Sequence, residues 1–462
     1  MNYDAVIAAV STPPGKGGVA IIRVSGEGAL NVAAKVFIPK NKKNLLDIEA
    51  RRAAYGNVVY RGEEIDDGLL YYYKAPSSYT GEDTVEISCH GGSLITKTVL
   101  EALFAAGARP AEAGEFTRRA LLNGRLSLTD AEAVANLLDA KTEAQIMIST
   151  EASRSHLARE IDTLREKLTD TLSSMWARID YPDEDLGDFS DEELISRLSA
   201  VAEKMENLLS SYKTGRAVNE GIKTTICGKP NVGKSSLYNV ILGEDRAIVT
   251  DIPGTTRDVL SAEVSLGKTL LLLSDTAGVR QASNDKVELI GIERSRAAIK
   301  NAELIIALFD GSCDFSSEDE EIISAIGTTR ATKIAVLNKC DRKKVFPKEK
   351  IEKHFDKILE LSALTAPNEA RILLGKTIDS LFTDESITLG RSAVIANARQ
   401  YAALLHAKEF IEAAESSLSA GLPQDLASSD VERALGEIAE LDGKAVNEEV
   451  LDKIFANFCV GK

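Results

Sequence analysis

Five short motifs between residues 228 and 363 constrain the fold of this 462-residue chain more than any other feature. They are a glycine-rich loop that ends in Lys-Ser, a Gly-Thr-Thr string, an Asp-Thr-Ala-Gly string, an Asn-Lys-Cys-Asp string and a Ser-Ala pair. In chain order they occupy residues 228–235, 254–256, 275–278, 338–341 and 362–363. This order and spacing predicts a guanine-nucleotide pocket on a parallel sheet wrapped by helices.

The first of these motifs is a phosphate loop. Its glycines at 228 and 233 let backbone N–H groups turn toward phosphates at the start of a helix. Lys234 supplies a positive charge to the β and γ phosphates of GTP, and the Ser235 hydroxyl is a ligand for Mg²⁺. Thr256 is expected to sense the γ-phosphate and bind Mg²⁺, and Asp275 to hold the water shell of that ion. The residues predicted to bind GTP or GDP are Asn231, Val232, Gly233, Lys234, Ser235, Ser236, Thr250, Asp251, Ile252, Pro253, Gly254, Thr255, Thr256, Asp275, Thr276, Ala277, Gly278, Asn338, Lys339, Asp341, Ser362 and Ala363.

The Asn-Lys-Cys-Asp string narrows the nucleotide to guanine. The Asp341 carboxylate can accept two hydrogen bonds from guanine N1–H and its exocyclic amine, which adenine cannot offer. A site built around such polar groups rejects the wrong base by roughly 10⁴–10⁵. A string of this kind also occurs by chance in surface turns, but here it ends an apolar run, residues 333–337, that is typical of a buried strand.

The residue after the Asp-Thr-Ala-Gly string is Val279, where many GTPases have a glutamine that positions the attacking water. An apolar side chain cannot orient water, so hydrolysis either takes polar help from elsewhere or is slow. The side-chain oxygen of Asn231 could coordinate a monovalent cation near the phosphates and so supply positive charge. The alternative is that Asn231 only stabilises the loop.

Composition limits the partners of the chain. With 71 acidic and 55 basic residues its formal charge is -16, so any contact with nucleic acid must use a local basic patch or a partner protein. Five cysteines are scattered without pairing or metal spacing, which favours a reducing cytoplasm. No stretch approaches the roughly 20 apolar residues of a membrane span, and we expect a cytoplasmic protein without membrane contact.

The pattern along the chain predicts an α/β nucleotide-binding domain inserted into a discontinuous helical domain. Residues 125–181 and 391–420 contain neither glycine nor proline and carry apolar residues at helical spacing. His90 is expected to serve the turn before Gly91 and Gly92. The expected domains are a mixed α/β domain at 1–120, a helical domain at 121–217 and 385–462, and a Ras-like G domain with a mostly parallel sheet at 218–384.

Four strings together identify a family. They occupy residues 12–19, residues 79–83 with 90–92, residues 254–258, and the C-terminal residues 459–462. On these strings the chain resembles the MnmE, or TrmE, family of tRNA modification GTPases over essentially its whole length. The last string is specific because it must lie at the C-terminal end.

The resemblance implies an activity beyond GTP hydrolysis. The family acts with an FAD-dependent partner of the MnmG, or GidA, type on the wobble uridine (position 34) of certain tRNAs. It adds an aminomethyl or carboxymethylaminomethyl group to carbon 5 with a one-carbon unit from methylene- or formyl-tetrahydrofolate. The N-terminal domain binds the folate and forms a homodimer, and the G domains pair when potassium is bound.

The resemblance also assigns residues by position. Glu288 matches the family's water-orienting glutamate and joins Lys234 and Asn231 as expected catalytic residues. Cys459 is either a reactive group or a small buried packing group. The expected potassium ligands are Asn231, Thr250, Ile252 and Thr255. The expected folate ligands are Arg23, Glu86, Arg125 and Lys462.

Two other functions use the same motifs. A ribosome-assembly or other regulatory GTPase would act as a switch without modification chemistry, but such proteins usually append an RNA-binding module, and no GXXG-type loop in a basic setting follows residue 384. A folate-dependent transferase with an inactive G domain would leave five intact motifs without a purpose. The sequence therefore favours a GTPase that acts in tRNA modification.

Overall fold

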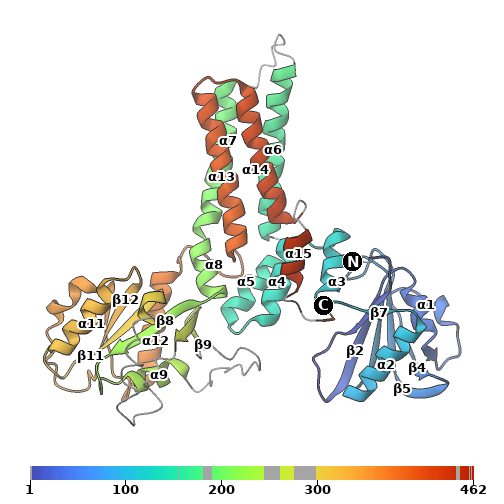
Figure 1. Ribbon diagram of the computed structural model, residues 1–462, viewed down its shortest axis with the longest axis horizontal. Helices are drawn as coiled ribbons and strands as arrows, with labels where there is room; N and C mark the ends of the chain where they lie inside the picture. The colour runs from blue at the N-terminus through green and yellow to red at the C-terminus, as the bar shows by residue number, and fades with distance from the viewer. Residues whose placement is uncertain are drawn as a thin grey trace. The chain divides into compact units, whose positions relative to one another are not determined.

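The computed structural model describes residues 3–153, 156–180, 190–243, 261–274, 298–443, 448–456, 458, 460 and 461. These residues form two compact units (Figure 1). Unit 1 contains residues 1–138, 152–202 and 403–462, and unit 2 contains residues 139–151 and 203–402. Each unit therefore gathers segments that are far apart in the sequence.

The N-terminal part of unit 1 is a seven-stranded sheet with the strand order β3-β4-β5-β6-β2-β1-β7. All neighbouring strands are antiparallel except β1 and β7. The strands are β1 (Ile7–Val10), β2 (Gly17–Ser25), β3 (Phe37–Pro39), β4 (Ala53–Tyr60), β5 (Glu63–Tyr73), β6 (Thr84–Gly91) and β7 (Arg109–Pro110). The helices between them are α1 (Ala29–Ala34), the short η1 (Leu45–Asp47) and α2 (Ser93–Ala106).

The two faces of this sheet differ because side chains alternate along a strand. Ile22 on β2, Leu70 on β5 and Ile87 on β6 are fully buried in the core that α1 and α2 complete. The neighbouring residues Arg23 and Glu86 point to the opposite face and stay partly exposed. Arg23 therefore lies where a binding residue can reach a ligand while its neighbours hold the strand in place.

The rest of unit 1 is helical. Helix α3 (Glu115–Leu122) leads into α4 (Leu128–Asp139) and the long α6 (His156–Asp180), and α6 packs against α14 (Gln424–Asp442). Helices α7 (Asp191–Ser210) and α13 (Ala398–Ser419) contribute their residues up to 202 and from 403, and α15 (Glu448–Phe455) closes the chain. Buried apolar residues recur along these helices at the helical spacing that the sequence predicts. Examples are Leu164, Leu168, Met175, Leu194, Leu198, Ile411, Val431 and Ile438.

Unit 2 contains a six-stranded sheet with the order β13-β12-β11-β8-β10-β9, in which only β9 is antiparallel. Its strands are β8 (Ile222–Gly228), β9 (Ser261–Leu266), β10 (Thr269–Ser274), β11 (Leu304–Asp310), β12 (Thr332–Asn338) and β13 (Lys357–Glu360). Its helices are α5 (Glu143–Ser153, up to residue 151), α8 (Tyr212–Asn219), α9 (Lys234–Leu242), α11 (Ser317–Gly327) and α12 (Pro367–Phe382), with the short η2 (Lys348–Lys350) and η3 (Glu352–His354).

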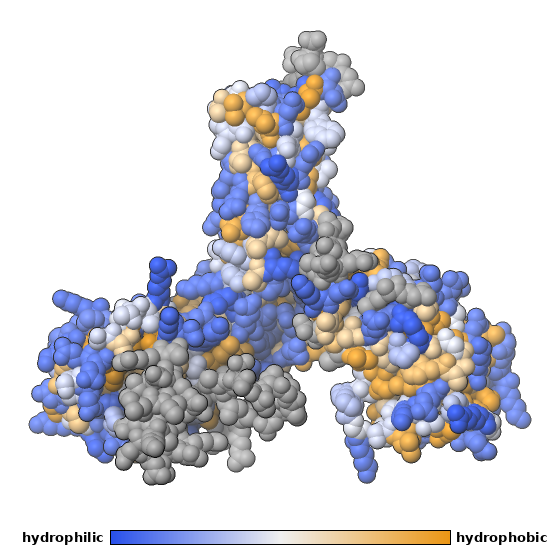
Figure 2. Space-filling view, in the orientation of Figure 1, coloured by the Kyte–Doolittle hydropathy of each residue, from blue (hydrophilic) through white to orange (hydrophobic). Residues whose placement is uncertain are grey.

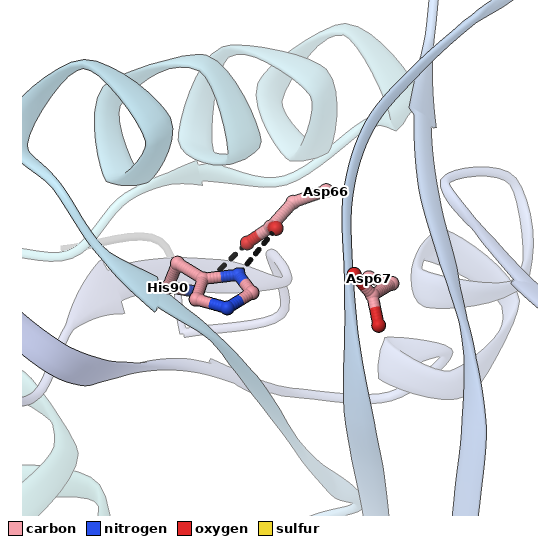
Figure 3. A group of neighbouring side chains, drawn as sticks. All are labelled: Asp66, Asp67 and His90. Atoms are coloured by element: carbon pink, nitrogen blue, oxygen red, sulfur yellow. Dashed lines mark hydrogen bonds and ion pairs between the residues drawn. The ribbon is translucent and has the colours of Figure 1, made fainter.

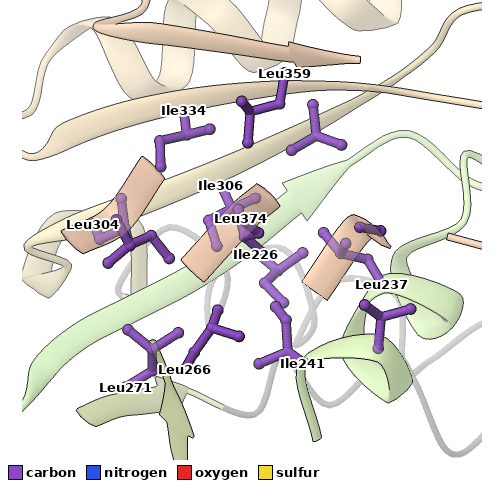
Figure 4. Close-up of a cluster of buried hydrophobic side chains, with 14 of the residues drawn as sticks. Ile226, Leu237, Ile241, Leu266, Leu271, Leu304, Ile306, Ile334, Leu359 and Leu374 are labelled. Atoms are coloured by element: carbon purple, nitrogen blue, oxygen red, sulfur yellow. The ribbon is translucent and has the colours of Figure 1, made fainter. Parts of the chain in front are cut away.

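The strands of unit 2 have apolar sequences because they are buried in its core. Every residue of β11 is buried, as expected for a central parallel strand covered on both faces. Figure 4 shows Ile306 on β11 with Ile226 on β8 and Leu237 on α9 in one apolar cluster. The predicted fold class is confirmed: a mixed α/β N-terminal domain, a discontinuous helical domain and an inserted G domain with a mostly parallel sheet.

Within the described ranges, no helix has the length and apolarity needed to cross a membrane.

Candidate functional site

The phosphate loop joins β8 to α9, as the motif predicts. Strand β8 ends at Gly228 and α9 begins at Lys234, so the first turn of the helix faces the loop. Gly233 has φ +104°, and a Cβ atom there would lie 2.2 Å from Nδ2 of Asn338. Only glycine fits at this position, because L-residues avoid this φ and because Asn338 takes the space.

Two lysines hold the shape of the loop. The Lys234 Nζ donates to the carbonyl oxygens of Gly228 and Lys229, each at 2.8 Å, and burial lowers the pKa of its ammonium group. The Lys229 Nζ donates to Asp319 Oδ2 at 2.8 Å and to Ser316 Oγ at 3.1 Å. Ser316 and Asp319 form the capping box of α11, so the start of that helix anchors the loop. Lys234 thus has its ammonium group inside the loop whose N–H groups would face the phosphates.

Asn338, at the end of β12, ties three parts of the pocket together. Its Nδ2 donates to the carbonyl oxygen of Val232 at 2.8 Å, and its Oδ1 accepts from the Ala363 N–H at 3.0 Å. Asn338 is buried, so both hydrogen bonds are shielded from water. The side chain therefore fixes the distance between the phosphate loop and the segment of residues 362–363.

Asp341 presents a carboxylate at the predicted base-reading position. The Ser362 Oγ donates to Asp341 Oδ1 at 2.6 Å, which lowers the pKa of the carboxyl group and keeps it ionised. The Asp341 side chain is otherwise exposed, so it is open to a ligand. An ionised carboxylate held by one hydroxyl has acceptor capacity left for the two donors of guanine.

Lys339 bridges the base-reading string and the phosphate loop. It has φ +65°, and its Nζ donates to the Asn231 carbonyl oxygen at 2.9 Å and to Asp310 Oδ2 at 2.6 Å. Burial alone would raise the pKa of Asp310, but hydrogen bonds from Lys339 and Ser312 outweigh it and lower that pKa to about 2. The ion pair stays charged at neutral pH and positions Lys339 beside the loop.

A second group of predicted residues lies on the N-terminal sheet. Arg23 on β2 faces Glu86 on β6 in register, and Nε donates to Oε1 at 2.9 Å. The Arg23 guanidinium also lies over the rings of Tyr79, at 5.2 Å, and Phe116, at 5.6 Å. This aromatic setting fixes a charged donor and a carboxylate side by side on a face that can receive a flat ligand.

The loop of residues 79–83 is held by a buried ion network. Arg119 on α3 is 1% exposed and donates to both carboxylate oxygens of Glu82, at 3.0 and 3.1 Å, and to Glu115 at 2.9 Å. The stem of Arg125 lies against Gly81 of the same loop. Two of the four predicted folate residues, Arg23 and Arg125, therefore contact this loop, and a third, Glu86, is paired with Arg23.

Comparison with known proteins decides the family. A family profile described as "GTP-binding protein TrmE N-terminus" matches residues 6–125, and one described as "MnmE helical domain" matches residues 128–459. The chain is 41% identical to the tRNA modification GTPase MnmE of Thermotoga sp. (strain RQ2), over 99% of both chains. It is 40% identical to the protein of the same name from Clostridioides difficile (strain 630), over the full length of both. The chain belongs to the MnmE family of tRNA modification GTPases. It is a GTP hydrolase, and the expected family resemblance is confirmed.

Several residues of the predicted sites lie outside the described part of the chain. They are Thr250, Asp251, Ile252, Pro253, Gly254, Thr255, Thr256, Asp275, Thr276, Ala277, Gly278, Glu288, Cys459 and Lys462. Within the described part, Ser235 is exposed and Ser236 partly exposed in the first turn of α9, where a hydroxyl can meet a phosphate-bound Mg²⁺. Asn231 is exposed in the loop with φ +63°.

The C-terminal residues of this MnmE family member contact the N-terminal domain. Val460 forms an antiparallel bridge with Ala113, and the Ser11 Oγ donates to the Gly461 carbonyl oxygen at 3.0 Å. Phe455 and Phe458 pack together in a cluster with Leu128. These contacts bring the residue before Lys462 to the first strands of the domain that carries Arg23.

His90 is placed differently from the expectation. It lies in β6 rather than in a turn, and its Nδ1 and backbone N–H both contact the Asp66 carboxylate at 2.7 Å (Figure 3). The hydrogen bond that the ring donates to the Asp66 carboxylate raises the pKa of His90. Asp67 lies nearby and accepts from the Tyr55 hydroxyl at 2.6 Å. Because both Asp66 oxygens already bind His90, the group is a link between β5 and β6.

Two supporting residues of the nucleotide site were missed in the sequence. Asp310 ends the apolar strand β11 beside β8, and Asp319 lies in the capping box of α11. The signal for Asp310 was present, because polar residues at the carboxyl ends of parallel strands line the binding crevice of such sheets. Asp319 gives no such signal, since its role depends on Lys229 reaching it across 90 residues of chain.

Proposed function

We propose that this chain is a potassium-dependent GTPase that modifies tRNA together with an FAD-dependent partner of the MnmG type. The product is an aminomethyl or carboxymethylaminomethyl group on carbon 5 of the wobble uridine (position 34). The observation that carries the proposal is that one chain holds both the guanine pocket around Asn338 and Asp341 and the paired Arg23 and Glu86. Relatives that are 40–41% identical over the full length are named tRNA modification GTPases.

The GTP step uses the residues of the phosphate loop and the two switches. Mg²⁺, held by Ser235 and Thr256, neutralises charge on the phosphates when bound. Lys234 and the loop N–H groups orient the same phosphates, and Asp341 orients the base. Val279 cannot position water, so Glu288 takes that role. Asn231, Thr250, Ile252 and Thr255 would hold a potassium ion, which would supply positive charge when bound. Hydrolysis then drives pairing of the G domains and a conformational change.

The folate step is assigned to the N-terminal domain. A pteridine ring carries amide-like donors and acceptors that the Glu86 carboxylate can bind, and arginines suit the carboxylates of its glutamate tail. The Arg23 guanidinium already stands between Glu86 and two aromatic rings, which is a suitable environment for a flat heterocycle. Arg125 lies on the neighbouring loop, and the tail of the chain brings Gly461, before Lys462, to the same domain. When bound, methylene- or formyl-tetrahydrofolate supplies the one-carbon unit.

A homodimer through the N-terminal domain completes the proposal. The sheet face that carries Arg23 bears apolar residues that no helix of the described domain covers, among them Val19, which is 62% exposed, and Tyr55, which is 52% exposed. Exposed apolar side chains gathered on one face are typical of an interaction surface. A second copy of the chain is the proposed occupant, and the MnmG-type partner binds to the dimer.

The proposal is tested on tRNA from cells that lack this protein. We expect nucleoside mass spectrometry to show unmodified carbon 5 at the wobble uridine of the affected tRNAs. Expression of the intact chain should restore the modification, and expression of Lys234→Ala should not. Normal wobble uridine in the deleted strain would reject the modification function. If those cells accumulate immature ribosomal subunits instead, the chain is an assembly switch.

Potassium dependence is tested separately. Because potassium would supply the positive charge beside the phosphates, we expect replacement of K⁺ by Na⁺ at equal ionic strength to slow GTP hydrolysis by about tenfold or more. Phosphate release is measured at saturating GTP in both salts. The Asn231→Ala variant should be slow in both. Equal rates of the unchanged protein in K⁺ and Na⁺ would remove potassium from the mechanism.

A further inference from the structure

The N-terminal domain carries an exposed basic surface in a chain that is otherwise acidic. Residues 35–61 contain seven Lys or Arg residues and only two acids, Asp47 and Glu49, whereas the whole chain has a formal charge of -16. We call the six cations at one end of the sheet the basic rim. They are Lys40, Lys42, Lys43, Arg51, Arg52 and Lys74, and all are exposed. In Figure 2, hydrophilic side chains project from the part of this domain where Figure 1 labels α1, β4 and β5.

Backbone pairing brings the basic rim together. The Lys40 N–H donates to the Tyr55 carbonyl oxygen at 2.9 Å, so the chain leaves β3 beside the start of β4. The Arg51 N–H donates to the Tyr72 carbonyl oxygen at 2.7 Å, so the residues that enter β4 lie beside those that leave β5, where Lys74 follows. Since adjacent strands are about 4.8 Å apart, the rim occupies the same end of three neighbouring strands.

Within the described residues, most of the rim cations have no carboxylate partner although they lie close together. Arg52 pairs with Glu49 at 3.3 Å, but no side-chain ion pair reaches Lys40, Lys42, Lys43 or Arg51 from any residue that the structure describes. The basic segment after Asp341 is different, because Lys344 and Lys348 both contact Glu360. Like charges held together without counter-charges repel one another, and they attract an external polyanion.

The backbone also supports a binding role for these side chains. Lys42 has φ +56° and Arg51 has φ +65°, a region that glycine and asparagine adopt more readily than long side chains do. Residues held in such conformations cluster at binding sites. A cation is present at both positions where a turn alone would favour glycine or asparagine.

The position of the rim relates it to the candidate folate residues. Cross-strand register places Arg23 opposite Glu86, Glu86 opposite Tyr71 and Tyr71 opposite Ala53. Ala53 directly follows Arg51 and Arg52 in the chain. Three strand spacings of about 4.8 Å put Ala53 roughly 14 Å from Arg23. A polyanion on the rim would therefore lie next to the proposed one-carbon site.

We propose that the basic rim is the surface on which the chain binds the phosphate backbone of its RNA substrate. The inference rests on the proposed function, which makes a tRNA the substrate and places one-carbon chemistry beside Arg23 and Glu86. Phosphate contacts of Lys and Arg set the position of a nucleic acid without reading its sequence. The rim would hold the backbone while the single-stranded anticodon loop extends its wobble uridine toward the folate residues.

The test measures RNA binding by the full chain. The probe is a fluorescent anticodon stem-loop RNA with uridine at the wobble position, titrated at several KCl concentrations. The rim variant combines Lys40→Gln, Lys42→Asn, Lys43→Gln and Arg51→Asn, with asparagine at the two positions of positive φ. The control variant removes four exposed lysines that form no ion pair within the described residues. These are Lys167→Gln, Lys343→Gln, Lys353→Gln and Lys376→Gln.

We expect the rim variant to lose about tenfold or more in affinity and the slope of log K against log salt to fall by about 3, since each phosphate contact contributes roughly 0.7–0.9. The control should stay within twofold. GTP hydrolysis and thermal unfolding should match the unchanged protein in both variants.

Unchanged RNA affinity in the rim variant would overturn the inference and point to an acidic protein as the partner. Absence of RNA binding by the unchanged chain at low salt would overturn it as well. Failure of this inference can be told apart from failure of the proposed function. If wobble uridine is unmodified in cells lacking the chain and the rim variant still binds RNA normally, only the binding surface is wrong.

Discussion

We expect Asp341→Asn to weaken GTP binding by roughly 10²–10⁴, because two charge-assisted hydrogen bonds at about 1.5–3 kcal/mol each are lost. The asparagine oxygen can still accept from Ser362 Oγ, which contacts Asp341 Oδ1 at 2.6 Å, so the loop should keep its place. The new amide N–H₂ faces the exocyclic amine of guanine as a second donor. Xanthine has a carbonyl there, so xanthosine triphosphate should bind better by a similar factor.

The measurement is a titration of both nucleotides against the Asp341→Asn variant and the unchanged chain. Asp314→Asn is the matched control, since Asp314 is exposed in the same domain and, among the residues that the structure describes, its side chain accepts a hydrogen bond only from the neighbouring Phe315 N–H. It should leave both affinities unchanged. If Asp341→Asn keeps its preference for GTP over xanthosine triphosphate, then Asp341 does not read the base.

Strands with a continuous apolar pattern can be predicted from the sequence. Strands whose residues are determined by contact with an adjacent strand cannot. The apolar runs of β8, β11 and β12 are visible because parallel strands are buried on both faces. Strand β4 is not indicated by the sequence alone, because Gly56 and Asn57 interrupt its pattern. Gly56 is needed there because a Cβ atom would lie 2.4 Å from the Ile38 carbonyl oxygen of β3. That contact is set by tertiary packing, which a local pattern does not record.

The candidate sites divide in the same way. Residues within a motif, such as Asn338 and Asp341, can be identified from the sequence because nucleotide binding requires side chains of that kind at that spacing. Residues that support them from elsewhere, such as Asp310 and Asp319, carry no motif, and their roles appear only when β11 and α11 are placed beside the loop. Arg23 and Glu86 are 63 residues apart, and their pairing depends on the register of β2 with β6.

Gly233→Ala should disable the nucleotide site with little change elsewhere. Alanine at φ +104° is strained, and its Cβ would stand 2.2 Å from Asn338 Nδ2. Relief requires that Asn338 move, which breaks its hydrogen bonds to the Val232 carbonyl oxygen and the Ala363 N–H. A strained backbone costs about 1–3 kcal/mol, and a buried group left unpaired costs about as much again. We expect the affinity for GDP, and likewise that for GTP, to fall by about 10²–10³.

Gly327→Ala is the control for this substitution, because Gly327 ends α11 in the same unit and, beyond its chain neighbours and the backbone of its own helix, no described atom lies within 4 Å of the added Cβ. With alanine at this position, the thermal stability of the chain should be unchanged or higher, since glycine is a weaker helix former than alanine by roughly 1 kcal/mol. Calorimetric titration of GDP measures both variants. If Gly233→Ala binds GDP as the unchanged chain does, then Asn338 can leave Val232 without loss, and the link from phosphate loop to base pocket has no role in nucleotide binding.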